Sequence, residues 1–175
     1  MSCDLLVITA SHGENLRLAE RFAAAGRARG FDPLVLDLTT LDLPLFTSRR
    51  RQETPPEAVA ALQRMLEAAP RWVICAAEYN GSIPPALTSA IAWLSVQGED
   101  FRLLFNHRPV AIATHSGSGG VEVLTSLRIQ LAHLGAVVVG RQLVTTPQRP
   151  AADASIDDLI DRLATLPAPP SDPAS

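Results

Sequence analysis

Residues 72–94 read WVICAAEYNGSIPPALTSAIAWL, and this stretch decides the fold. It opens with an apolar run, 72–77, which lacks the polar alternation of a half-exposed strand and therefore predicts a strand buried on both faces of a parallel sheet. Pro84 and Pro85 then suit the first turn of a helix. The apolar stripe of that helix is Leu87, Ala90, Ile91 and Leu94. The stretch is thus a strand, a polar turn and an amphipathic helix in direct succession.

The same unit recurs on both sides of this stretch. Further apolar runs occupy 4–10, 34–38, 109–114 and 136–139. The helical stripes that follow them are Leu18, Phe22 and Ala25; Val59, Leu62, Leu66 and Ala69; Leu124, Leu127, Leu131 and Leu134; and Ile156, Leu159, Ile160 and Leu163. Ser155 is the expected N-cap of the last helix. Five β-α units predict one doubly wound domain over residues 1–165, with helices on both faces of a five-stranded parallel sheet. The proline-rich segment 166–175 is predicted to be a disordered tail.

The composition excludes several classes of function. The net charge of −3 gives no electrostatic basis for binding nucleic acid. No apolar run approaches the roughly 20 residues that cross a bilayer, and no basic leader precedes the first strand, so we expect a cytoplasmic protein without membrane contact. All fifteen Lys and Arg positions are arginine, which excludes a lysine Schiff base and the lysine of a Walker-type nucleotide loop. Two cysteines are too few for a disulfide framework or a zinc site.

Three polar loops, 10–16, 77–85 and 114–120, follow the first, third and fourth predicted strands. In a parallel sheet of order 2-1-3-4-5 those three strands are neighbours. Ligands of such sheets bind at the carboxyl ends of the strands, near the point where the strand order reverses. We therefore expect the three loops to form one site.

Each loop has a functional and a plain structural interpretation. Ser11 and Asn15 lie at a helix N-terminus, where free N–H groups and the helix dipole favour an anion such as phosphate; simple capping by these residues is the alternative. The second loop contains the only tyrosine, Tyr79, and an Asn80-Gly81 turn whose backbone faces either a ligand or solvent. The glycines of the third loop allow close approach to a ligand, or give a flexible loop.

The second loop and its helix resemble a known family. Residues 78–84 with Leu87, Ala90, Ile91 and Trp93 are similar to the stretch P-E-Y-N-x-S-x-P-x-x-L-x-N-A-I-D-W of the NADPH-dependent FMN reductases, the flavodoxin-like azoreductase and quinone-reductase group. Residues 43–46, LPLF, resemble the L-P-L-F/Y element of that family, and 116–135 resemble its S-x-G-x-x-G-G…L-R-x-x-L-x-x-L-G segment. The resemblance spans roughly residues 4–145.

The resemblance implies a flavodoxin-like three-layer α/β/α fold with strand order 2-1-3-4-5. It also implies that NADPH or NADH delivers hydride to bound FMN, which reduces a small-molecule acceptor such as a quinone, an azo compound or free flavin. The flavin carries the chemistry, so no catalytic side chain is expected. The implied cofactor-binding residues are Ser11, Gly13, Asn15 and Leu16 in the phosphate loop; Glu78, Tyr79, Asn80 and Gly81 along the isoalloxazine edge; and Ser116, Gly117 and Gly120 at the other polar edge of the ring.

The resemblance further implies a homodimer or homotetramer. Trp93 is expected on an exposed helix face, as a residue of the type that anchors interfaces. His12 and His115 either donate to the cofactor or are ordinary loop residues. The basic run 49–51 either contacts the 2′-phosphate of NADPH or is a solvated loop.

The first loop departs from the family pattern G-S-x-R-x-x-S-x-N. It is shorter, it has no arginine between Ser11 and Asn15, and Glu14 puts a carboxylate beside the predicted phosphate position. We therefore expect Glu14 to weaken FMN binding. Two other function classes stay open: a flavodoxin-type carrier that receives electrons from a protein partner, and a non-catalytic family member with weak or lost FMN binding.

Overall fold

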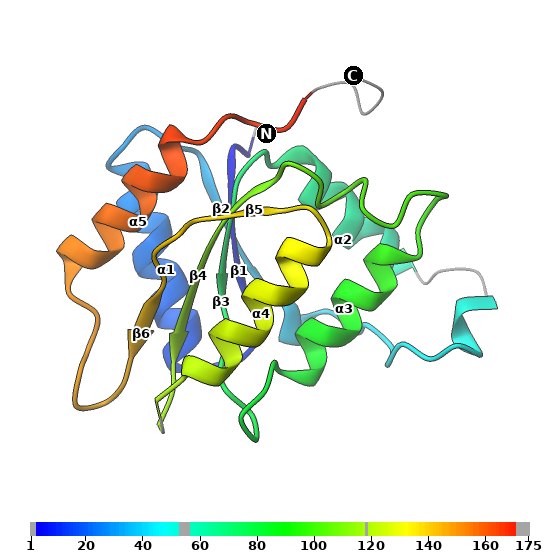
Figure 1. The fold of residues 1–175 in the computed structure, drawn as a ribbon, viewed down its shortest axis with the longest axis horizontal. Coiled ribbons are helices and arrows are strands. Elements are labelled where there is room, and N and C mark those ends of the chain that lie inside the picture. Colours follow the sequence, from blue (N-terminus) through cyan, green and yellow to red (C-terminus); the bar gives the residue numbers. More distant parts are fainter. Residues whose placement is uncertain (1–2, 53–56, 118, 171–175) are drawn as a thin grey trace.

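The computed structural model describes residues 3–52, 57–117 and 119–170. At its centre is a parallel sheet in the order β2-β1-β3-β4-β5, with β6 also paired to β4 (Figure 1). The strands are β1 (Leu5–Thr9), β2 (Pro33–Asp37), β3 (Trp72–Cys75), β4 (Pro109–His115), β5 (Val137–Val138) and β6 (Leu143–Thr145). Every residue of β1 and β3 is buried, as their unbroken apolar runs predicted. The predicted strand order is confirmed.

Helices cover both faces of the sheet. The helices are α1 (Glu14–Arg27), α2 (Glu57–Ala68), α3 (Pro85–Ser95), α4 (Val121–His133) and α5 (Asp153–Thr165). Helices α1 and α5 pack on one face, and α2, α3 and α4 pack on the other (Figure 1). Each face has its own apolar cluster of buried side chains. Two 3₁₀ turns, η1 (Leu38–Thr40) and η2 (Arg50–Gln52), lie in the connection from β2 to α2.

The last strand is divided, which the sequence did not predict. Of the predicted strand 136–139, only Val137–Val138 forms ladder pairs, with Pro109 and Val110 at the beginning of β4. The chain then returns as β6, which pairs with residues 113–115 at the end of β4. A run of three residues is too short for its pattern to predict a strand. The pairing of β6 matters for function, because β6 places Thr145 beside the carboxyl end of β4.

Two local predictions are wrong. Ser155 does not cap α5; the helix begins at Asp153, and the N–H of Ser155 donates to the carbonyl of Ala152, so Ser155 lies inside the first turn. Trp93 is not exposed; it is 1% exposed, its Nε1 donates to the carbonyl of Pro44 at 2.8 Å, and its ring meets Phe46 edge to face at 5.2 Å. Helical periodicity could not predict that a segment some fifty residues earlier covers this face of α3. Trp93 therefore holds the 43–46 segment on α3 and does not form an interface.

The predicted tail begins at Leu166, whose carbonyl accepts a hydrogen bond from Arg71 Nη2 at 3.0 Å. Residues 166–170 continue without helix or strand. The remainder of the predicted disordered tail, 171–175, lies outside the described residues.

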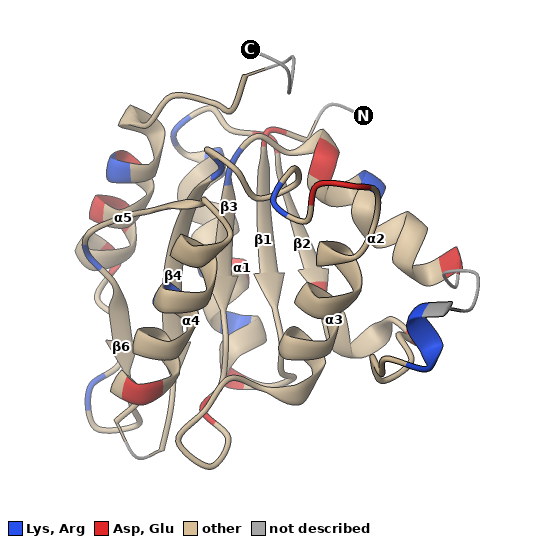
Figure 2. Ribbon diagram, turned by 45° about the vertical axis from the view of Figure 1, so that its right-hand side comes forward, with Lys and Arg blue, Asp and Glu red and all other residues tan. Residues whose placement is uncertain are grey.

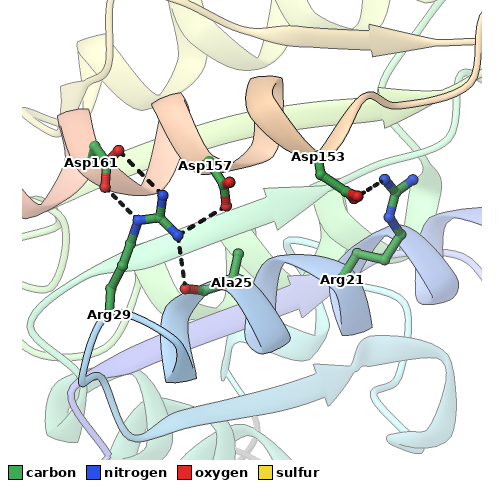
Figure 3. A network of polar contacts seen from close by, with 6 residues as sticks. All are labelled: Arg21, Ala25, Arg29, Asp153, Asp157 and Asp161. Carbon is green, nitrogen blue, oxygen red and sulfur yellow. Dashed lines mark hydrogen bonds and ion pairs between the residues drawn. The ribbon is translucent and has the colours of Figure 1, made fainter.

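Ion pairs join α5 to α1 across the outer surface (Figure 3). Arg29, just after α1, contacts Asp157 at 2.9 Å, forms an ion pair with Asp161 and donates to the carbonyl of Ala25. Arg21 Nη2 contacts Asp153 Oδ1 at 2.7 Å. The three aspartates recur every four residues, so they lie along one face of α5. These ion pairs hold α5 beside α1 on the face of the sheet that both helices cover.

We expect Arg29→Ala to lower the midpoint of thermal unfolding by about 2–4 °C, a shift typical of a small network of half-exposed ion pairs in a chain of this length. The difference from the wild-type protein should shrink in high salt. Acid should also remove the contribution of these ion pairs to the stability of the fold. Because Arg29 holds the pKa of Asp161 below its ordinary value, the pairing stabilises the fold above about pH 4 and is lost as the pH falls through the folded-state pKa. Arg27→Ala removes a charge of the same sign from the last turn of α1 and is the control. An equal midpoint for Arg29→Ala and wild type would mean that the apolar face of α5 alone holds the helix.

Candidate functional site

The three predicted loops meet at the carboxyl edge of the sheet, the lower edge in Figure 1. They were predicted over 10–16, 77–85 and 114–120; the connections that the structure describes are the first loop (residues 10–13), the second loop (76–84) and the third loop (116, 117, 119 and 120). Hydrogen bonds join the elements that carry them. Thr114 Oγ1 at the end of β4 donates to the carbonyl of Ala76 at 2.6 Å. The N–H of Val123 in the first turn of α4 donates to Glu78 Oε2 at 3.3 Å. The loops are thus parts of one connected edge.

The first loop leaves a buried hydroxyl without a partner. Thr9 Oγ1 donates to the carbonyl of Ser11 at 2.8 Å and turns the chain sharply after β1. Gly13, with φ +84° and ψ −127°, then begins α1 with no side-chain cap. Ser11 is 4% exposed, and its Oγ has no hydrogen-bond partner among the described residues. The capping interpretation of this loop is therefore wrong.

An anion at this helix N-terminus would satisfy several donors at once. The first N–H groups of a helix have no partner within the helix, and the helix dipole favours negative charge there. A buried hydroxyl without a partner costs about 1–3 kcal/mol. A bound phosphate accepts hydrogen bonds from both kinds of donor, so Ser11, Gly13 and Leu16 fit the predicted phosphate loop.

Asn15 has a clear structural task. Its side-chain Nδ2 donates to the carbonyl of His115 at 2.9 Å, and its Oδ1 accepts from the N–H of His115 at 2.8 Å. The start of α1 is therefore clamped to the end of β4. The predicted contact of Asn15 with phosphate stays a prediction, and it would use the second amide hydrogen or the backbone N–H.

The second loop is a rigid two-residue hairpin. The N–H groups of Tyr79 and Ser82 donate to each other's carbonyls at 3.1 and 3.0 Å. Asn80 and Gly81 between them have φ values of +53° and +69°, as a type I′ turn requires. Tyr79 is 49% exposed. The carboxylate of Glu78 lies at the N-terminus of α4, where the helix dipole favours it. The hairpin therefore projects Tyr79 and the turn backbone from a fixed base.

The third loop depends on Gly120. Its φ is +78°, and a Cβ there would lie 2.5 Å from Thr114 Cγ2 and 3.2 Å from Ser116 Cβ. Ser116 is buried, and its N–H donates to the carbonyl of Thr145 on β6 at 3.0 Å. At Gly117, by contrast, a Cβ would meet nothing within 4 Å. Ser118 lies outside the described residues.

Sequence reasoning missed a set of buried threonines that hold these loops. Thr9 is the last residue of β1, and Thr114 lies one residue before the end of β4. Their hydroxyls donate hydrogen bonds to the carbonyls of Ser11 and Ala76. A threonine at the end of an apolar run, just before a polar loop, was a usable indication of this role. Thr145 had no such indication, because β6 was not predicted.

The basic run 49–51 lies in the β2–α2 connection, to the side of α3 (Figure 2).

Other groups fit a structural role. Burial raises the pKa of the Cys75 thiol within β3, and this cysteine belongs to the core. At the opposite, amino edge of the sheet, a cleft of about 510 Å³ is lined in part by Arg108. Burial lowers the pKa of Arg108 to about 10, and its guanidinium donates to the carbonyls of Ala69 and Leu104. This arginine therefore satisfies backbone carbonyls just after α2 and in the segment that precedes β4. The described residues contain neither a cluster of metal-ligating side chains nor a helix able to cross a membrane.

The sheet is parallel in the order 2-1-3-4-5, an uncapped helix N-terminus follows β1, and the loops after β3 and β4 converge on it. This arrangement defines a flavodoxin-like protein. The sequence matches the family model described as NADPH-dependent FMN reductase over residues 3–150. The chain belongs to the NADPH-dependent FMN reductase family.

One relative by sequence agrees with this assignment, and two solved structures share the fold. An NADPH azoreductase of Bacillus sp. (strain OY1-2) is 31% identical over 126 residues, which cover 71% of this chain and 67% of the relative. The solved structure of FerB, a flavoenzyme NAD(P)H:(acceptor) oxidoreductase from Paracoccus denitrificans, has a TM-score of 0.74 at 20% identity and covers 94% of this chain and 98% of its own. A flavodoxin from the domain Archaea has a TM-score of 0.61 at 11% identity, covering 93% and 95%.

The family defines the chain as an oxidoreductase whose cofactor is FMN and whose electron donor is NADPH. The residues present fit that cofactor. The unpaired Ser11 hydroxyl and the uncapped start of α1 suit its phosphate, and the absence of a side chain at Gly120 keeps the third loop close to β4.

Proposed function

We propose that this chain transfers hydride from NADPH to FMN held by the three loops, and passes the electrons to a small acceptor such as a quinone, an azo compound or free flavin. The observation that carries the proposal is the buried, unpaired Ser11 hydroxyl at the uncapped N-terminus of α1. In an NADPH-dependent FMN reductase, that arrangement suits the phosphate end of the cofactor.

The chain's own residues then bind and orient. Ser11, Gly13, Asn15 and Leu16 would hold the phosphate; Glu78, Tyr79, Asn80 and Gly81 would line one ring edge; and Ser116, Gly117 and Gly120 would line the other. When bound, FMN supplies the hydride chemistry, so no side chain has to act as acid, base or nucleophile. The exposed Tyr79 ring offers a flat surface beside the site.

The acceptor is proposed from two supports. A relative of 31% identity is an NADPH azoreductase. The hairpin residues from Tyr79 to Ser82 are exposed, which leaves the site open to flat small molecules. With a net charge of −3, the chain lacks the strong acidity with which carriers dock on basic partners.

The test is steady-state oxidation of NADPH by the purified chain with added FMN, with a quinone or an azo dye as acceptor. We expect turnover without any partner protein, which separates an enzyme from an electron carrier. FMN binding without turnover would favour the carrier, and no FMN binding would favour a non-catalytic member. Replacing NADPH by NADH in the same assay measures the preference between donors.

Glu14 provides a separate prediction. Its carboxylate lies at the start of α1 and forms an ion pair with Arg17. We expect Glu14→Gln to tighten FMN binding several-fold, because it removes a charge of the same sign as the phosphate and frees Arg17. The gain should be larger at low salt than at high salt. Glu20→Gln, farther along α1, is the control. Equal affinities for Glu14→Gln and wild type would mean that Glu14 only stabilises the helix dipole.

Assembly and location are also proposed. We infer that the chain forms a homodimer or homotetramer and acts in the cytoplasm. Its partner in the reaction is a small-molecule electron acceptor. Because Trp93 is buried within the chain, the support now comes from exposed apolar residues of α4, Val121 and Ile129. Light scattering at micromolar concentration should give at least the dimer mass; a monomer mass would contradict the inference.

A further inference from the structure

His115 lies where β4 ends, and hydrogen bonds fix its ring. Its Nδ1 lies 3.1 Å from Thr145 Oγ1, and that hydroxyl also lies 3.0 Å from the carbonyl of Thr114. A carbonyl only accepts, so the single proton of Thr145 goes to Thr114. Thr145 must therefore accept from His115, and Nδ1 carries the hydrogen. Neutral His115 is thus left with an unprotonated Nε2, which becomes a charged donor when it takes up a proton.

The backbone of His115 is held against the anion-binding end of α1. Asn15, the second residue of that helix, bonds through its side chain to both the N–H and the carbonyl of His115. Ser11, with its unpaired buried hydroxyl, precedes the same helix. The imidazole therefore belongs to a residue fixed next to the predicted phosphate position.

Two other basic groups at this end, Arg17 and His12, already face carboxylates. The titratable and charged side chains of the surrounding elements that lie toward this end include Glu14, Arg17 and Arg21 of α1, His12 of the first loop, Asp37 of β2, Glu78 of the second loop, Glu122 of α4, Asp153 of α5 and Arg149 beyond β6; Arg21 and Asp153 pair with each other. Arg17 pairs with Glu14, and His12 Nδ1 lies 3.6 Å from Asp37 Oδ2. The ring of His115 faces a hydroxyl. A phosphate bound beside this ring would therefore give His115 an anionic partner, which His12 already has in Asp37.

We propose that His115 takes up a proton at Nε2 when FMN binds and acts as the cationic partner of its phosphate. The proton comes from solvent and no covalent bond to the ligand forms. This inference rests on the proposed FMN site. It follows that FMN affinity rises as the pH falls through the range in which an imidazole titrates, whereas riboflavin, which lacks the phosphate, binds equally well throughout.

The test measures dissociation constants of FMN and riboflavin by quenching of flavin fluorescence, between about pH 8.5 and about pH 6.5, where the phosphate is mainly dianionic. We expect FMN to bind about three- to tenfold more tightly at the lower pH, with no change for riboflavin. His115→Gln should abolish the dependence, and His12→Gln should keep it. A dependence that persists in His115→Gln, or that riboflavin shares, would overturn the inference.

A second measurement needs no variant. Calorimetry of FMN binding to the wild-type chain in buffers of different ionisation enthalpy counts protons taken up. We expect net uptake for FMN near neutral pH and none for riboflavin. FMN binding without proton uptake defeats this inference alone, whereas failure of FMN to bind at any pH defeats the proposed function and this inference with it.

Discussion

Ser11→Ala should weaken FMN binding by about tenfold or more while leaving the ligand-free chain at least as stable as the wild type. The two effects have opposite signs because the hydroxyl is unpaired in the ligand-free chain. A hydrogen bond to a charged group contributes about 1.5–3 kcal/mol, and about 1.4 kcal/mol corresponds to a tenfold change in dissociation constant. Removing a buried hydroxyl that has no partner should stabilise the free chain by up to about 1–2 kcal/mol.

Riboflavin separates this explanation from a general disturbance of the site. If Ser11 binds the phosphate, Ser11→Ala should leave riboflavin affinity unchanged. Ser155→Ala, in α5, removes a hydroxyl away from the loops and should change neither affinity. Equal losses of FMN and riboflavin affinity would show that Ser11 shapes the loop without contacting the phosphate. An unchanged FMN affinity would remove the observation on which the proposed function depends.

Gly120→Ala should destabilise the fold by about 2–4 kcal/mol and abolish FMN binding. An alanine at φ +78° costs about 1–2 kcal/mol, and its Cβ would lie 2.5 Å from Thr114 Cγ2. Thr114 cannot move freely, because its hydroxyl donates to the carbonyl of Ala76. The collision is therefore transmitted from the third loop to the second. Urea unfolding gives the stability, and flavin fluorescence gives the binding.

A second substitution tests whether this contact is the cause. Thr114→Ser removes Cγ2 but keeps the hydroxyl, so Thr114→Ser combined with Gly120→Ala should recover part of the lost stability. Gly140→Ala is the matched control, since a Cβ there meets nothing within 4 Å and its φ is not positive. A double variant no more stable than Gly120→Ala would mean that backbone strain alone, and not the collision, is responsible.

The sheet could be predicted because its central strands, β1, β3 and β4, are buried on both faces. Such strands read as unbroken apolar runs, and the intervening helices have clear apolar stripes, so the parallel order followed from the alternation. The convergence of the loops followed from the same topology. The pair Asn80-Gly81 was predicted as a turn because only a few residue types accept positive φ in succession, and both residues have it.

What failed or was missed depends on contacts between distant segments. The burial of Trp93 requires Pro44 and Phe46 to lie across α3, and no local pattern expresses that contact. The strand β6 is three residues long and gains its place by pairing with the end of β4. The tautomer of His115 depends on that same strand. The unpaired state of Ser11 could not be predicted either, because a hydroxyl at a helix start has several possible partners.

The proposed function requires that the three loops bind FMN in a state that NADPH reduces. The most direct measurement adds NADPH, without oxygen, to the chain reconstituted with one equivalent of FMN, and follows the visible absorbance of the flavin. We expect rapid bleaching, which a quinone or an azo dye reverses, whereas the Ser11→Ala chain at the same sub-saturating FMN concentration should bleach to a smaller extent. Bleaching no faster than that of free FMN with NADPH would contradict the proposed function.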